Sequence, residues 1–374
     1  MNMLPYANFS QLAAAAARPA AQIDAARPIW IFGAGNFGRS LCRAMQGNGI
    51  QVAGFVETAP KIGSVSDLPV VDWPTLAHKD KASQLALGIL NRATPFDELV
   101  SIAAKAGFSQ MLMPWDTYDA YSQELGWRFW LSKRDFLISG LERMARVAER
   151  LADQESRDIL LRMAAFRLGL DLPFASFCSE EKQYFNEITL HSLSKKPITY
   201  VDCGAYTGDT FSDLVSQPDI HCTQAFLLEP DPGNFDTLTG NIRVRHPQAI
   251  CLPLAAADKY SILTFSSGQG EGGQIGVHGD IHIAAVALDQ MLPQIQVDLI
   301  KLDVEGAEAQ VLDGARRTIE RCRPVLTMSL YHNPQDPWAL PELLFELCPD
   351  YAFYIRQHYF NSFESVLYAV PRSR

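Results

Sequence analysis

The chain has 374 residues, of which 48% are hydrophobic and 20% charged. This composition excludes a disordered chain. The length is sufficient for two domains of ordinary size. Lysine and arginine total 32 against 42 aspartates and glutamates, and the resulting net charge of −10 argues against a nucleic acid partner.

The sequence also indicates a compartment. The seven cysteines are odd in number and form no Cys-x-x-Cys pair, which favours a reducing environment over a disulfide framework or a zinc site. The alanine-rich stretch Leu12–Ala17 lacks the basic region of a secretory signal. No uncharged apolar run reaches about 18 residues, so we expect no membrane span. We therefore expect a cytoplasmic protein.

Strand and helix signals alternate over the first zone of the chain, from about Arg27 to Pro114. Such alternation predicts a small parallel α/β unit, and we assign residues 1–114 to a Rossmann-like domain of the nucleotide-binding type. The expected strands are Pro28–Phe32, Gln51–Glu57, Gln84–Leu90 and Gln110–Met113, and the expected helices run from the glycine-rich turn to Gln46 and near Phe96–Ala106.

A glycine-rich turn, Gly33-Ala-Gly-Asn-Phe-Gly38, follows the first of these strands and opens a helix. Glu57 ends the next strand, so Gly33, Gly35, Gly38 and Glu57 have the layout of a dinucleotide fingerprint. The ligand would be NAD(P) or a nucleotide-sugar. The unit lacks a Tyr-x-x-x-Lys pair for reductase chemistry, and it equally suits a fold retained without a ligand.

The second zone, Trp115–His191, is expected to be mostly helical. Apolar residues recur at spacings of three and four, which marks one buried helix face: Leu137, Leu141, Met144, Ala148 and Leu151. A second helix is expected over Arg157–Leu168. We interpret residues 115–191 as a helical connector that packs the two α/β units together, with a substrate lid as the alternative.

The third zone is a second doubly wound domain, residues 192–374. A mainly parallel sheet with an antiparallel strand at the end fits the pattern. The expected strands are Ile198–Val201, Ala225–Leu228, Ala249–Pro253, Leu299–Leu302, Pro324–Leu330, Tyr351–Ile355 and Ser365–Ala369, and the expected helices are Thr210–Val215, Pro232–Asn241, Glu305–Thr318 and Leu340–Leu347. The fold class is thus α/β, with two Rossmann-like domains joined by a helical segment.

Acidic residues follow three successive strands of this domain. The run Val201-Asp-Cys-Gly-Ala-Tyr-Thr-Gly-Asp-Thr210 carries small residues that let the backbone approach a ligand, and Leu227-Leu-Glu-Pro-Asp231 ends the next strand. Without a phosphate-binding Gly-Lys-Ser/Thr, the turn suits S-adenosylmethionine, a nucleoside that carries a sulfonium. Glu229 would bind the ribose and Asp258 the adenine. The predicted cofactor-binding residues are Asp202, Gly204, Ala205, Tyr206, Gly208, Thr210, Glu229, Asp231 and Asp258.

A further acidic run, Ile300-Lys-Leu-Asp-Val-Glu-Gly-Ala-Glu308, ends a fourth strand. Together with the two earlier runs, and with Ser329-Leu-Tyr-His-Asn-Pro334 near the end of the chain, it resembles the FkbM family of S-adenosylmethionine-dependent methyltransferases. The resemblance covers about Tyr184 to Pro371. The chain departs from the broader methyltransferase pattern at Tyr206, where many such enzymes have glycine.

The resemblance implies O-methylation of a hydroxyl on a sugar, a glycan or a polyketide-type small molecule. A sugar hydroxyl is a weak nucleophile at neutral pH, so a base or a divalent metal would help. Asp303 and Glu305 are the first candidates for a base or a metal ligand, and His332 is a second candidate base. We interpret Glu308 as a helix N-terminal charge. Alternatives are an NAD(P)-dependent sugar-modifying oxidoreductase or a nucleotide-sugar-binding module that uses the N-terminal unit.

Overall fold

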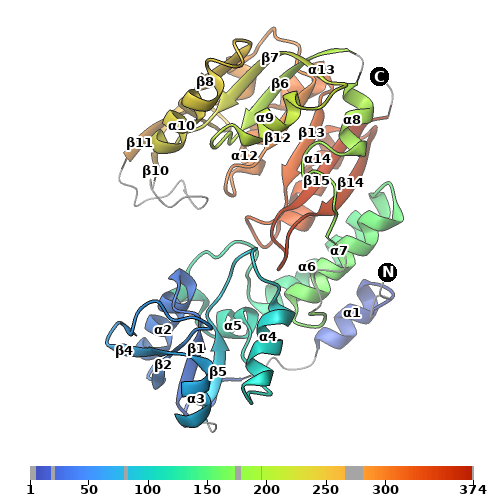
Figure 1. The fold of residues 1–374 in the computed structure, drawn as a ribbon. Helices are drawn as coiled ribbons and strands as arrows, with labels where there is room; N and C mark the ends of the chain where they lie inside the picture. Colours follow the sequence, from blue (N-terminus) through green and yellow to red (C-terminus); the bar gives the residue numbers. More distant parts are fainter. Residues whose placement is uncertain are drawn as a thin grey trace.

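The structure is a computed structural model, and it describes residues 6–17, 22–79, 83–172, 178–194, 196–265 and 281–372. Figure 1 shows two α/β units, one at each end of the chain, with the helices α6 (Arg134–Arg150) and α7 (Gln154–Arg167) beside the sheet of the second. Within the described residues, no helix is long and apolar enough to cross a membrane.

The first unit is built on a five-stranded sheet. Its order is β3-β4-β2-β1-β5, and all neighbours are parallel except β3 and β4. The strand order therefore reverses between β1 and β5, which makes that point the crevice of a doubly wound sheet. The strands are β1 (Ile29–Phe32), β2 (Val52–Val56), β3 (Ser64–Val65), β4 (Leu68–Val71) and β5 (Gln84–Leu87).

The first five helices of the chain pack against different parts of the protein. α5 packs against α2, whereas α1 packs against α6 and places Leu12 and Ala16 in the same core cluster as α6 and α7. The helices are α1 (Phe9–Ala16), α2 (Asn36–Gly47), α3 (Trp73–Lys79), α4 (Phe96–Lys105) and α5 (Pro114–Leu125).

α6 and α7 join the two units through the core. The apolar stripe expected from the sequence is buried at Leu137, Leu141, Met144 and Leu151. α6 packs against α14 (Asp336–Leu347), and α7 packs against β14 (Tyr351–Gln357). Both helices therefore pack on the second unit.

The second unit is built on a seven-stranded sheet of order β14-β15-β13-β12-β6-β7-β8. The strands from β13 to β8 are parallel, and β15 runs antiparallel between β13 and β14. The order reverses between β6 and β12, so a second crevice lies there. The strands not yet bounded are β6 (Pro197–Cys203), β7 (His221–Leu228), β8 (Ala249–Leu252), β12 (Leu299–Leu302), β13 (Val325–Ser329) and β15 (Ser365–Pro371).

A small three-stranded sheet adjoins this one, with β9 (Leu254–Ala256), β10 (Ser261–Phe265) and β11 (Ile281–Val286) in the order β10-β11-β9. The remaining helices of the unit are α8 (Glu187–Leu193), α9 (Asp209–Val215), α10 (Pro232–Ile242), α11 (Leu288–Met291), α12 (Glu308–Gly314) and α13 (Arg316–Cys322). α10 starts where the Asp231 side chain accepts the Gly233 and Asn234 N–H groups, with Pro232 in the first turn.

Two expected elements differ in the structure. The expected strand over Gln110–Met113 is wrong: only Leu112 forms a parallel bridge, to Ala86. The expected helix Glu305–Thr318 is two helices, α12 and α13, which meet at Ala315, where the backbone leaves the helical region. The small sheet was not foreseen, because its strands pair outside the main sheet.

Candidate functional site

A cavity of about 650 Å³ lies at the carboxyl ends of β6, β7 and β12, beside the reversal point of the second sheet. Ligands of open α/β sheets bind in this place. Six of the nine cofactor-binding residues expected from the sequence of this unit lie there. The cavity is lined by Gly204, Tyr206, Thr210, Glu229, Asp231 and Asp258, and also by Asp303 and Glu305.

The turn after β6 is shaped by three residues with left-handed backbone angles. Gly204 (φ +88°) is so close to the next strand that a Cβ would lie 1.9 Å from the Asp303 carbonyl oxygen. Gly208 (φ +82°) precedes α9. Tyr206 has φ +49°, which explains why glycine is common at this position in the broader methyltransferase pattern. The Tyr206 N–H donates to Glu229 Oε2 at 2.8 Å.

Glu229 stands at the end of β7 as expected for a ribose ligand. It is 5% exposed, and its Oε1 accepts the Asp231 N–H at 2.9 Å. Burial raises the pKa of Glu229 to about 6, although these backbone N–H groups oppose the rise. Asp258 follows β9 rather than the third strand of the main sheet, and it lines the same cavity from the small sheet.

Asp202 does not line the cavity. It is fully buried, and its Oδ1 accepts from Lys301 Nζ at 3.0 Å. Lys301 is itself buried and also donates to the Gly204 carbonyl oxygen at 2.7 Å. Burial raises the pKa of Asp202, and the Lys301 ammonium opposes that rise. Asp202 therefore holds Lys301 under the glycine turn instead of reaching into the cavity. Ala205 is buried beside it.

Asp303 follows β12 and faces the cavity with both oxygens held. Oδ2 accepts from Tyr184 Oη at 3.0 Å, and Oδ1 accepts from Ser329 Oγ at 2.9 Å. Burial acts to raise the pKa of Asp303, but the charges of Lys301 and His332 hold it below its usual value. Asp303 is therefore an ionised carboxylate in a fixed orientation.

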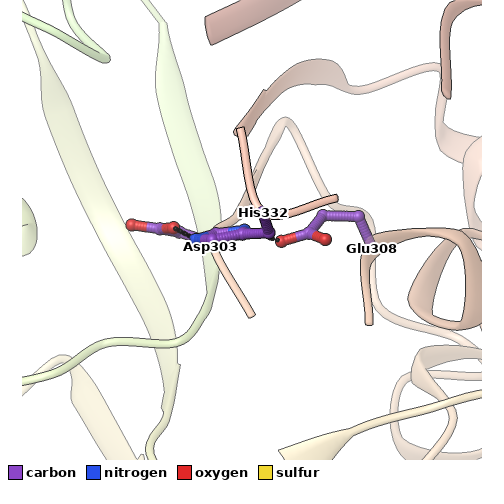
Figure 2. Close-up of side chains that lie close together, drawn as sticks. All are labelled: Asp303, Glu308 and His332. Carbon is purple, nitrogen blue, oxygen red and sulfur yellow. Dashed lines mark hydrogen bonds and ion pairs between the residues drawn. The ribbon is translucent and has the colours of Figure 1, made fainter. Parts of the chain in front are cut away.

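His332 follows β13 and joins the acidic groups of two turns. Its Nδ1 lies 2.7 Å from Glu308 Oε1, and Nε2 lies 3.4 Å from Asp303 Oδ1 and 3.6 Å from Glu305 Oε2. Figure 2 shows Asp303 and Glu308 on opposite sides of the imidazole. Burial acts to lower the pKa of His332, but Glu308 and Glu305 raise it well above its usual value. The Trp127 indole N–H donates to the His332 carbonyl at 2.9 Å.

Glu305 and Glu308 differ in environment. Glu305 (φ +53°) lines the cavity, and burial raises its pKa to about 8. Glu308 is 1% exposed and, as expected, sits in the first turn of α12. It is not a solvated helix charge, however, because its Oε1 accepts the Val304 N–H and contacts His332. The sequence analysis missed this pairing.

A second part of the cavity wall consists of residues that the sequence analysis did not assign to the site. It includes Arg92, Trp127, Gln183, Tyr184, Tyr331 and Glu364. Arg92, in the loop after β5, pairs with Glu364, which follows the tip of the β14–β15 hairpin. Gln183 Nε2 donates to Glu364 Oε2 at 2.7 Å. The first unit thus reaches the cavity from the carboxyl end of its own sheet.

Asn361 fastens the tip of the same hairpin to the first unit. It is fully buried with φ +57°, and its amide donates to the Asn91 carbonyl at 2.8 Å and to the Thr94 carbonyl at 2.7 Å. Its Oδ1 accepts the Phe96 N–H at 2.9 Å. This hairpin clamp, made of Asn361 with residues 91–96, sets where Glu364 stands in the cavity.

The glycine turn of the first unit has the geometry of its motif. Gly33 has φ +104°, and a Cβ on Gly38 would lie 2.0 Å from the Gly33 carbonyl oxygen. Glu57 Oε1 accepts the Ala34 N–H at 3.2 Å, much as Glu229 accepts from the turn after β6. Gly35 is exposed. None of these residues lines the cavity described above. A nucleotide at this turn stays a prediction.

Fold and cavity together are typical of a Rossmann-like protein that binds a nucleoside cofactor. Residues 202–362 match the model of the methyltransferase FkbM domain. This part of the chain is an FkbM methyltransferase domain, and such a domain implies methyl transfer from S-adenosylmethionine.

A solved structure of 21% sequence identity shares the fold. The chain is similar to methyltransferase FkbM from Methylobacillus flagellatus KT, with a TM-score of 0.77 at 21% identity over 96% of this chain and 98% of that one. A precorrin-6y C5,15-methyltransferase from Geobacter metallireducens GS-15 matches with a TM-score of 0.32 at 12% identity, over 53% of this chain and 95% of that one. No curated protein matches the sequence.

Proposed function

We propose that the protein transfers the methyl group of S-adenosylmethionine to a hydroxyl of a sugar, a glycan or a polyketide-type small molecule. The observation that carries the proposal is that one cavity joins a nucleoside-type seat at Glu229 and Asp258 to the fixed carboxylate of Asp303. In-line attack needs the hydroxyl oxygen and the methyl carbon held in contact, and alignment of this kind supplies much of the rate.

The cofactor would lie across the carboxyl ends of β6 and β7. Glu229 would accept the ribose hydroxyls, Asp258 the adenine amino group, and the Gly204 turn would hold the methionine end. Lys301 has a positioning role, because it ties the Gly204 carbonyl to Asp202 beneath the turn. Asp202 therefore acts on the cofactor through Lys301 and the turn.

Asp303 would serve as the base or as the group that orients the acceptor hydroxyl. In the reaction the hydroxyl oxygen forms the bond to the methyl carbon, the carbon–sulfur bond breaks, and S-adenosylhomocysteine leaves with the sulfur electron pair. The hydroxyl proton passes to a carboxylate, for which Asp303 and Glu305 are placed on the cavity wall and His332 directly behind them.

A sugar-like acceptor fits the second part of the cavity wall, which includes Trp127, Tyr331 and Arg92. Trp127 and Tyr331 offer aromatic surface, and Arg92, Gln183 and Glu364 offer hydrogen-bonding groups. This mixture suits a ring that carries both C–H faces and hydroxyls. The order β4-β2-β1-β5 and the turn at Gly33 favour a second candidate function for the first unit, binding of NAD(P) or a nucleotide-sugar.

Calorimetric titration tests these assignments. S-Adenosylmethionine should bind the wild-type chain, and Glu229→Ala should abolish binding while the fold is retained by circular dichroism. NAD and NADP are the comparators, with Glu57→Ala as the matched variant of the first unit. If NAD(P) binds and S-adenosylmethionine does not, the proposed site is wrong and the first unit carries the activity.

Turnover is tested with labelled cofactor and a panel of sugars, nucleotide-sugars and polyketide alcohols. Asp303→Asn should retain cofactor affinity and lose label transfer. If Asp303→Asn transfers the label at the wild-type rate, the base lies elsewhere.

A further inference from the structure

We infer that Asp303, Glu305 and His332 Nε2 form a divalent cation site on the wall of the cavity, with Glu308 orienting the imidazole from behind. The site deepens the proposed function, on which its catalytic role rests, but cation binding itself can be tested without any methyl acceptor. Three features of the described residues carry the inference.

The first feature is an unpartnered buried nitrogen. His332 is fully buried, and among the described residues its Nε2 has no hydrogen-bond partner; the same holds for Glu305 Oε2. Buried polar atoms are rarely left unpaired in folded proteins. Here two of them face one another at 3.6 Å, on a wall that opens to the cavity through Glu305.

The second feature is spacing. Nε2 lies 3.4 Å from Asp303 Oδ1 and 3.6 Å from Glu305 Oε2. These distances are too long for good hydrogen bonds. They are close to the separation of about 3.0–3.5 Å expected between two ligand atoms that each lie about 2.1 Å from one ion. Each carboxylate therefore lies at a distance from Nε2 that suits an ion shared between the two ligand atoms.

The third feature is the outer contact of the histidine. Glu308 Oε1 takes Nδ1 at 2.7 Å and is itself held by the Val304 N–H at 3.0 Å. This contact holds the Nδ1 proton toward Glu308, so a bound cation would displace the other proton of the imidazolium, the one on Nε2, which is directed away from Glu308. Metal-binding histidines are commonly oriented by such a carboxylate. Figure 2 shows Glu308 on the side of the ring away from Asp303, so the second carboxylate at Nε2 is Glu305, at 3.6 Å, rather than Glu308.

Three protein ligands leave coordination positions open toward the cavity, as catalytic metal sites require. Two carboxylates and one imidazole suit Mn²⁺, Fe²⁺ or Zn²⁺ and tolerate Mg²⁺. A hydroxyl bound at an open position would lose its proton more readily, and its oxygen would be fixed beside the methyl donor. The proton leaves to a carboxylate or to solvent, and no electron transfer is involved.

In the test, a chelator first removes bound metal from the whole chain. The chain is then titrated with Mn²⁺, and binding is measured by electron paramagnetic resonance and by calorimetry. We expect one site per chain. Glu305→Gln and Asp303→Asn should each raise the Kd for Mn²⁺ at least tenfold. Asp209→Asn, which removes a cavity-lining carboxylate from the start of α9, is the matched control and should bind as wild type does.

Two results overturn the inference: no stoichiometric Mn²⁺ binding, or Mn²⁺ binding that Glu305→Gln and Asp303→Asn leave unchanged. The cofactor titration separates this failure from failure of the proposed function, because S-adenosylmethionine binding that depends on Glu229 would stand without a cation. Chelated protein that transfers methyl at the full rate would refute the catalytic role of the cation and leave the methyltransferase assignment intact.

Discussion

Cofactor binding should weaken as the pH falls through 6, because the ribose ligand Glu229 must be ionised to accept two hydroxyl hydrogen bonds. Burial raises the pKa of this carboxyl to about 6. A group with that pKa is about 97% ionised at pH 7.5 and about 9% ionised at pH 5.0. The apparent Kd of the cofactor should therefore rise about tenfold across this range, or about 1.4 kcal/mol.

The assay is calorimetric titration with S-adenosylhomocysteine, whose own ionisable groups do not change charge appreciably between pH 5 and 7.5. Glu229→Gln should bind weakly at every pH and lose the tenfold dependence. Glu57→Gln, the equivalent change in the first unit, should keep it. A wild-type Kd constant within about twofold, or an equal pH dependence in Glu229→Gln, would refute the reasoning.

Four other changes probe the structure. Lys301→Met leaves Asp202 buried without its partner and should lower the free energy of unfolding by about 3–5 kcal/mol in urea; adding Asp202→Asn should restore part of it, and additive losses would contradict the pairing. Gly204→Ala places a Cβ against the Asp303 carbonyl and should weaken S-adenosylhomocysteine at least tenfold by calorimetry; unchanged binding would show that the turn can move. Asp303→Asn should slow turnover by about 10²–10⁴ with cofactor affinity within twofold, and parallel losses of both would assign it to cofactor binding. Asn361→Ala should cost about 1–3 kcal/mol of stability by chemical denaturation, and a cost near zero would show that the hairpin clamp is weak.

The sequence could predict which residues gather at the carboxyl edge of the second sheet, because the signals for this are local. Acidic residues and small residues follow individual strands, and strands of one parallel sheet end at one edge. Lys301 shows a signal that was available but not used. A lysine inside a four-residue strand of otherwise apolar residues must be paired if buried, and the register of β12 on β6 sets it opposite Asp202.

The other half of the site could not be read from the sequence. Arg92 and Glu364 are 272 residues apart, and no local pattern links them. Their contact depends on how one α/β unit is set against the other, which no periodicity encodes. The interpretation of Glu308 as a helix N-terminal charge was incomplete for a related reason. Its position in a first helical turn can be predicted locally, whereas its burial against His332 depends on where the residue that follows β13 lies in the fold.

The hairpin clamp connects two regions of the cavity wall that belong to different α/β units. Residues that would hold the methyl donor sit on the second sheet, whereas part of the acceptor wall is supplied or braced by the loop at residues 91–96. Sequence drift in that loop can move Arg92 and Glu364 while β6, β7 and their turns stay fixed. Substitutions in that loop would thus alter the proposed acceptor wall and leave the proposed cofactor residues in place.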